Sequence, residues 1–235
     1  EVITNPVGSV FRLTTAKAFS CRKRAVDSFI EKHGLIGPSI ETQEDIEEKY
    51  DVVVVGSDQV WNLSCTGGDK TYFLGDIPHG EVKKVSYAAS FGGASMPARM
   101  TSDLGKAIQD FDAISVREAS GVEIVKRLSG RDAVQVLDPT LLLAGEEWRN
   151  MCGSSHGEGG YVFAYVVSER RNTLRFAREV SDEMGLPLVI IDCYGAPRLS
   201  ERGLYINDAS PEEFLALIRD AALVITSSFH GLALS

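Results

Sequence analysis

Short apolar runs alternate with amphipathic segments over the first part of the chain. Val52–Val55 is a continuous β-branched run, and such runs are typical of strands buried on both faces of a parallel sheet. Between the second and third runs, Leu104, Ile108 and Phe111 have the spacing of one helix face. The predicted strands comprise residues 52–55, 84–90, 113–116 and 134–137.

The third predicted strand is followed by a helix-start signal. Ser120 and Glu123 have the spacing of a capping box, in which the serine and glutamate side chains satisfy free backbone N–H groups. Apolar residues then recur at helical spacing as far as Gly130, a residue type that commonly ends helices. We therefore predict a helix from about residue 120 to Gly130.

The composition changes over residues 144–160, which are polar, rich in glycine and without a hydrophobic period. Such a stretch is typical of a linker between domains. We therefore predict an N-terminal domain over residues 1–143 and a C-terminal domain over residues 161–235.

A second alternation of strands and helices begins after this stretch. Apolar runs predict strands at residues 161–167, 188–191 and 223–226. Residues 172–184 have a helical period, and the predicted inward positions are Leu174, Ala177, Val180 and Met184.

Another helix is predicted from Ser210, because a serine cap, a proline at the first helical position and a glutamate at the third form a strong start signal. Its predicted buried residues are Phe214, Leu217 and Ile218. A final helix is predicted to begin at Ser227–Gly231, directly after a strand.

These alternations predict an α/β protein with two Rossmann-like, doubly wound domains facing a cleft. Ligands in such folds bind beyond the carboxyl ends of the strands. The residues that directly follow each predicted strand are therefore the candidates for a functional site.

Charge and composition exclude several classes of function. The chain has 24 basic and 33 acidic residues and a net charge of −9, which argues against broad nucleic-acid binding. A small anionic ligand needs only local cations and stays compatible with this charge. No apolar run is long enough to span a membrane, and no predicted strand leads into a G-x-G-x-x-G or P-loop sequence.

The four cysteines lack the spacing of a zinc site, so we expect no structural metal and reduced thiols, as in a cytoplasmic protein. They are Cys21, Cys65, Cys152 and Cys193.

The richest strand end is Ser227–Gly231. Serines at a helix start, together with free backbone N–H groups and the helix dipole, form a ready anion site. Ser227 or Ser228 can bind a phosphate oxygen or cap the helix, and His230 lies within the first turn. The alternative for His230 is a histidine that serves only packing.

A second group of candidates follows the strands of the first domain. Arg117 offers a guanidinium suited to carboxylate or phosphate, and its alternative is a salt bridge to Glu118 or Asp112. Asp58 can contact sugar hydroxyls or act as a base, and Ser57 can contact the same hydroxyls; a turn or a helix cap is the alternative for both.

Taken together, these strand ends resemble the polysaccharide pyruvyl transferase family. The matching segments occur in the order of the family and cover about residues 50 to 235. They are residues 51–62, 86–92, 114–118, 136–143 with Trp148, and 224–233.

The resemblance implies a fold similar to GT-B glycosyltransferases and transfer of pyruvate from phosphoenolpyruvate to a sugar as a ketal. Family members usually begin with a strand and a glycine-containing loop, and they continue past the Ser-Phe-His-Gly motif. We therefore expect both ends of the chain to be truncated, with Glu1–Ile3 as the tail of the second strand.

The implied partners are phosphoenolpyruvate, as donor and not as cofactor, and a glycan acceptor. The resemblance supports His230 in acid–base chemistry or at the donor phosphate, and Arg117 at the anionic groups of the donor. By position, Ser227 and Ser228 are expected at the donor phosphate, and Ser57 and Asp58 at the acceptor. Exopolysaccharide synthesis for the cell envelope is the expected setting, in the cytoplasm or at the inner face of the membrane on a lipid-linked glycan.

Two rival functions share the predicted fold, because fold does not determine function. One is a GT-B glycosyltransferase that uses a nucleotide sugar. The other is a sugar-binding domain without catalysis, which has no need of an acid–base histidine.

Overall fold

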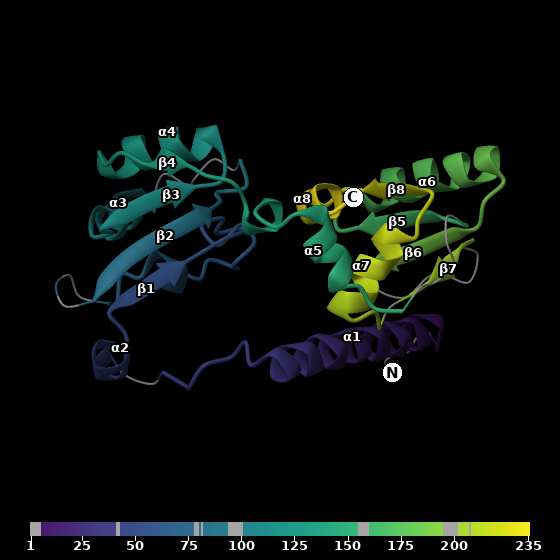
Figure 1. The fold of residues 1–235 in the computed structure, drawn as a ribbon, viewed down its shortest axis with the longest axis horizontal. Coiled ribbons are helices and arrows are strands. Elements are labelled where there is room, and N and C mark those ends of the chain that lie inside the picture. The colour runs from purple at the N-terminus through teal and green to yellow at the C-terminus, as the bar shows by residue number, and fades with distance from the viewer. Residues whose placement is uncertain are drawn as a thin grey trace, which may run out of the picture. The chain divides into compact units, whose positions relative to one another are not determined.

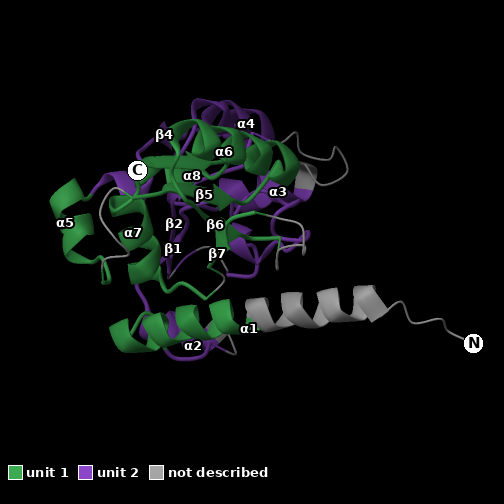
Figure 2. Ribbon diagram, turned by 90° about the vertical axis from the view of Figure 1, so that its right-hand side faces the viewer, with its two compact units in different colours: residues 1–37, 143–235 green, residues 38–142 purple. Residues whose placement is uncertain are grey.

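The computed structural model describes residues 6–40, 43–77, 80, 82–93, 101–154, 160–194, 202–206 and 208–235. Its contacts divide the chain into two compact units (Figure 2). Unit 1 comprises residues 1–37 and 143–235, and unit 2 comprises residues 38–142. Each unit contains one parallel sheet, which confirms the α/β class predicted from the sequence.

The described part of unit 2 contains a four-stranded parallel sheet in the order β1-β2-β3-β4 (Figure 1). The predicted strands are confirmed, although the last is shorter than expected. Their bounds are Val52–Val55 for β1, Lys83–Ala89 for β2, Ala113–Val116 for β3 and Val134–Gln135 for β4. The helices of this unit are α2 (Gln43–Lys49), α3 (Thr101–Gln109) and α4 (Ala119–Ser129), with 3-10 turns η1 (Thr71–Phe73) and η3 (Pro139–Leu141).

The core of unit 2 surrounds Trp61, which is fully buried and lies 5.2 to 5.6 Å, between ring centroids, from Phe73, Phe91 and Phe111. The predicted helix face is confirmed, since Leu104 and Ile108 on α3 are buried in the same cluster. Phe111 also belongs to it, just beyond the helix end.

The prediction that β1 is buried on both faces is wrong for the described residues. Val55 packs in the core, whereas the side chains of Val52 and Val54 are 43% and 57% exposed. Successive strand side chains point to opposite faces, and α3 and α4 pack against each other on one side of the sheet (Figure 1). The β-branched run therefore reflects strand propensity more than burial of both faces.

The helix after β3 begins earlier than predicted. The N-cap of α4 is Glu118, whose carbonyl accepts the first helical hydrogen bond from Gly121, so Ser120 lies within the helix and forms no capping box. The predicted end is confirmed, because Gly130 adopts a left-handed conformation and donates its N–H to Lys126.

The described part of unit 1 contains a parallel sheet in the order β7-β6-β5-β8. Three strands were predicted and are confirmed, and the short β7 was not predicted. Their bounds are Val162–Val166 for β5, Leu188–Asp192 for β6, Leu204–Tyr205 for β7 and Leu223–Thr226 for β8.

The helices of unit 1 that follow strands are α6 (Arg170–Met184), α7 (Pro211–Arg219) and α8 (Phe229–Ala233). The predicted cap of α7 is confirmed: Ser210 Oγ accepts from the Glu213 N–H, and the Glu213 carboxylate accepts from the Ser210 N–H. Leu217 and Ile218 are buried as predicted.

On α6, Leu174 and Ala177 are buried as predicted, and Val180 packs against the same cluster. Met184 is 45% exposed, so its predicted inward position is wrong. It is the last residue of the helix, where Gly185 turns the chain away in a left-handed conformation.

Two helices of unit 1 were not predicted. In α1 (Pro6–His33), polar and apolar residues are mixed around the helix. It contacts the later part of unit 1, because Lys32 Nζ lies 2.9 Å from Glu212 Oε1 on α7. Residues 1–37 are therefore grouped with residues 143–235, which differs from the predicted domain of residues 1–143.

The second unpredicted helix is α5 (Gly145–Asn150), which occupies part of the predicted linker. It forms because Glu147 accepts a hydrogen bond from the Ala144 N–H and thereby caps the first turn. Residues 155–159 and the predicted strand tail Glu1–Ile3 lie outside the described residues. Within the described ranges, no helix combines the length and apolar character required to cross a membrane.

Candidate active site

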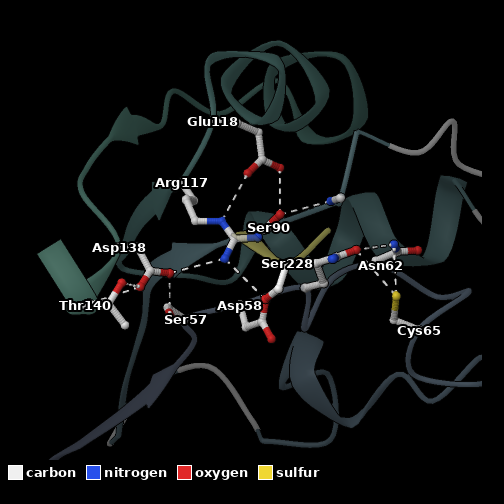
Figure 3. A network of polar contacts seen from close by, with 12 residues as sticks. Ser57, Asp58, Asn62, Cys65, Ser90, Arg117, Glu118, Asp138, Thr140 and Ser228 are labelled. Atoms are coloured by element: carbon white, nitrogen blue, oxygen red, sulfur yellow. Dashed lines mark hydrogen bonds and ion pairs between the residues drawn. The ribbon is translucent and has the colours of Figure 1, made fainter. Parts of the chain in front are cut away.

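Polar side chains from three strand ends of unit 2 meet around Arg117 (Figure 3). Arg117 follows β3, Asp58 follows β1, and Asp138 lies beyond β4. Nη1 of Arg117 lies 3.2 Å from Asp58 Oδ1 and 3.2 Å from Asp138 Oδ2. The parallel sheet explains this convergence, because its strands all place their carboxyl ends at one edge.

Asp138 is the buried anchor of this network, with a side chain only 1% exposed. Its Oδ2 accepts from Ser57 Oγ at 3.1 Å in addition to Arg117. Its Oδ1 accepts from the backbone N–H of Thr140 at 3.1 Å and from Thr140 Oγ1 at 2.8 Å, which caps the turn η3. A buried carboxylate with this many charged and neutral donors is well satisfied.

Glu118 supports the same edge from the next residue of the chain. Its Oε1 accepts from Ser90 Oγ at 3.0 Å and from the Phe91 N–H at 2.9 Å, both in the loop after β2. Its Oε2 lies 3.9 Å from Nε of Arg117, at the limit of an ion pair. Glu118 therefore joins the loop after β2 to the start of α4.

The salt-bridge alternative for Arg117 is confirmed, with Glu118 as the most distant of three partners. Asp58 and Asp138 lie closer to Arg117 than Glu118 does, and Asp112 instead accepts from the backbone N–H of Lys84 at 2.8 Å. The Asp58 side chain is 58% exposed and its backbone is left-handed, with φ of 65°.

Gly56 permits the close approach that places Ser57 and Asp58 at this edge. Its φ is 119°, and a Cβ added there would overlap the carbonyl oxygen of Tyr87 on β2. A side chain at position 56 would therefore push the Gly-Ser-Asp turn away from β2.

The strand ends of unit 1 carry the other predicted residues. Ser227 Oγ donates to the Ser168 carbonyl at 3.0 Å and accepts from the N–H groups of Val167 at 3.2 Å and Ser168 at 3.0 Å. Its hydroxyl therefore fastens the turn after β5 to the turn after β8.

Ser228 is the N-cap of α8, since its Oγ accepts from the Gly231 N–H at 3.2 Å. The capping alternative is thus confirmed for Ser228. His230 is the second residue of this short helix and is partly exposed, with its ring edge-on to Phe229 at 5.2 Å between centroids.

We expect Gly231→Ala to destabilise unit 1 by about 1–3 kcal/mol, the usual cost of overpacking. An added Cβ would lie 2.6 Å from Thr226 Oγ1 and 2.9 Å from Tyr165 Cδ1, which belong to the two strands under α8. Thermal unfolding of Gly231→Ala and Gly145→Ala measures this effect. Gly145 is the matched control, because its nearest atoms are the end of Arg149 at 3.7 Å or more. Equal melting temperatures for the two variants would contradict the expected crowding.

The structure brings together Ser57, Asp58 and Arg117 in one network of unit 2. Ser227, Ser228 and His230 occupy the β8–α8 turn of unit 1. The sequence interpretation missed the anchoring roles of Asp138 and Glu118. The Asp-Pro-Thr sequence after β4, with its capping geometry, was the available signal for Asp138.

No curated protein matches the chain. Residues 5–235 match the model of the family described as polysaccharide pyruvyl transferase. The match includes both strand-end groups described above, and the chain therefore belongs to the polysaccharide pyruvyl transferase family and is a transferase.

Proposed function

We propose that this transferase moves a pyruvyl group from phosphoenolpyruvate to a sugar of a polysaccharide or its precursor. The product is a pyruvate ketal, and inorganic phosphate is released. The observation that carries the proposal is the position of Arg117 at the strand ends of unit 2, where a buried Asp138 holds its guanidinium. Family membership supports the glycan acceptor.

The donor determines which groups the reaction requires. Protonation of C3 of the enol makes C2 electrophilic, and one sugar hydroxyl then adds to C2 and loses its proton. The C2–O bond to phosphate breaks, and a second hydroxyl attacks C2 and loses its proton to close the ketal. One of these protons is retained on C3, and the other leaves with phosphate.

His230 is the proposed acid–base residue of unit 1. Histidine side chains exchange protons near neutral pH, which suits both protonation of C3 and removal of a hydroxyl proton. Its place directly after a strand and its partial exposure support this assignment. Ser227 and Ser228 are proposed to contact the donor phosphate, in addition to the bonds that they form within the unit.

Arg117 is the proposed ligand of a donor carboxylate or phosphate. Its bond to Asp138 is buried, whereas Asp58 is more than half exposed. Exposed ion pairs contribute little free energy, so an anion can take the place of Asp58 at a small cost. Asp58, once displaced, and Ser57 are proposed to contact hydroxyls of the acceptor sugar.

This scheme uses side chains of the enzyme and its two substrates, without a separate cofactor. We place the reaction in exopolysaccharide synthesis for the cell envelope. The proposed location is the cytoplasm, or the inner face of the membrane where the acceptor is linked to a lipid.

We expect Arg117→Ala to raise the KM for phosphoenolpyruvate by about 10-fold or more, because a charge-assisted hydrogen bond is lost. Arg117→Lys keeps the charge without the planar fork and should give a smaller increase. Arg131→Ala is the control, since Arg131 is on the surface of the same unit and donates to the Gln109 carbonyl. An unchanged KM in both Arg117 variants would remove Arg117 from the donor site.

The proposed function is tested by phosphate release from the full-length enzyme. We expect release only when phosphoenolpyruvate and a pyruvylatable glycan are both present. Stabilisation by nucleotide sugars in a thermal-shift assay, without stabilisation by phosphoenolpyruvate, would favour a glycosyltransferase instead. Glycan binding without phosphate release would favour a binding domain.

A further inference from the structure

A second arginine lies at the carboxyl edge of a sheet, this time in unit 1. Arg170 is the first residue of α6, directly after the turn that follows β5, and its side chain is 25% exposed. Its Nε donates to Asp192 Oδ2 at 2.7 Å. Asp192 ends β6 and its side chain is fully buried.

Asp192 is itself held in place by the chain around it. Its Oδ1 accepts from the backbone N–H of Tyr194 at 2.9 Å, so both carboxylate oxygens are bonded. Arg22 of α1 donates to the backbone carbonyl of Asp192 at 3.0 Å. A second cation therefore lies at this edge, and the carboxylate of nearby Glu169 is bonded to Asn172.

The turn that carries Arg170 is joined to the turn that carries His230. In the sheet, β5 lies between β6 and β8, and all three strands are parallel. Ser227 Oγ bonds both the N–H and the carbonyl of Ser168, two residues before Arg170. Arg170 is thus held at the same edge of unit 1 as α8, which carries His230.

The charged groups at this edge differ from those in the network of unit 2. There, Arg117 lies within 4 Å of three carboxylates, those of Asp58, Glu118 and Asp138. At the edge of unit 1, the buried carboxylate of Asp192 pairs with Arg170, and Arg22 donates to the backbone carbonyl of the same residue. Two arginines therefore lie at this edge of unit 1, and local cations suit a small anionic ligand.

The contribution of the Arg170–Asp192 ion pair to stability does not by itself explain why the pair lies at a strand end. A buried ion pair is often no more stabilising than apolar residues of similar volume. At a strand end, the pair has a further effect, because one bond through Nε fixes the plane of a guanidinium that carries several donors.

We propose that Arg170 binds the phosphate or carboxylate of the small anionic donor, and that Asp192 is its positioning residue. The inference rests on the proposed function for the identity of the donor as phosphoenolpyruvate. The anion-binding property itself rests on the geometry of unit 1 alone.

The test uses the full-length enzyme with Arg170→Gln, Arg170→Lys and the control Arg175→Gln. Arg175 lies on the same helix, is 69% exposed and is 4.0 Å from Glu179. We expect Arg170→Gln to raise the KM for phosphoenolpyruvate about 10-fold or more and to leave the KM for the glycan unchanged. Arg170→Lys should recover part of the loss, and Arg175→Gln should behave as wild type. Unchanged donor KM in Arg170→Gln overturns the proposal.

Asp192→Asn tests the positioning role. Asparagine keeps an acceptor for the Tyr194 N–H but removes the charge that orients Arg170. We expect the donor KM to rise as in Arg170→Gln, while kcat falls by a smaller factor than the donor KM rises. A purely structural role would instead lower the melting temperature and leave the donor KM unchanged.

Stabilisation by inorganic phosphate separates this inference from the proposed function. We expect phosphate to raise the melting temperature of wild type and Arg175→Gln, with a smaller or absent shift in Arg170→Gln. If wild type releases no phosphate from phosphoenolpyruvate, the proposed function fails, and the phosphate shifts still decide the role of Arg170. Equal shifts in wild type and Arg170→Gln would overturn the proposed role of Arg170.

Discussion

His230→Ala is expected to lower the kcat for pyruvyl transfer by about 10²–10⁴-fold, the usual contribution of a positioned acid–base group. The KM for phosphoenolpyruvate should change less, because proton transfer matters in the transition state more than in the bound ground state. The fold should tolerate the change, since His230 is partly exposed and alanine favours a helix.

The measurement is phosphate release at saturating phosphoenolpyruvate and glycan, with His33→Ala as the matched control. The side chain of His33 is 41% exposed on α1, and its Nε2 lies 3.7 Å from Glu212 Oε1 on α7. His230→Gln should be as slow as His230→Ala, because glutamine can form hydrogen bonds but cannot exchange protons near neutral pH. Normal turnover in both His230 variants would end the acid–base assignment.

Asp138→Ala is expected to destabilise unit 2 by about 3–5 kcal/mol, the usual cost of removing one partner of a buried ion pair. Asp138 is almost completely buried, and its loss leaves Arg117, only 10% exposed, without its buried partner. Ser57 Oγ and both Thr140 donors lose their acceptor as well. Asp138→Asn should cost less, because it keeps an acceptor for Thr140.

Urea unfolding followed by tryptophan fluorescence measures this effect. The chain has two tryptophans, and in a Trp148→Phe background Trp61 reports on the core of unit 2. Asp132→Ala is the control, since Asp132 pairs with Lys126 at 2.7 Å on the surface of the same unit. A urea midpoint as high as that of the control would show that the network around Asp138 adds little to stability.

Strand positions were predictable because β-branched runs bounded by turn residues are a local signal. The signal does not report which faces of a strand are covered, so it did not predict the exposure of Val52 and Val54. Helix α1 was not predicted, since its apolar residues mark no single face and its packing on unit 1 depends on contacts such as Lys32–Glu212.

The polar residues at the strand ends were also predictable in part. Arg117, His230 and the serines of the β8–α8 turn are recognisable from residue type and from their place after a strand. The partners of Arg117 were not, because Asp58 and Asp138 are separated from it by 59 and 21 residues. Sequence proximity instead favoured Glu118 and Asp112, of which one is a distant partner and the other bonds Lys84.

The sequence by itself determined the alternation of strands and helices, the polar strand ends and the family, since these depend on local propensity and residue order. Only the tertiary structure decided that Asp138 and Asp192 are buried and that each holds an arginine at the carboxyl edge of its sheet. The physical reason is that parallel pairing brings distant strand ends to one edge, and burial there makes each carboxylate require a charged partner. The proposal for Arg170 therefore rests on the tertiary structure alone, although the neighbouring Ser227 was a candidate from the sequence.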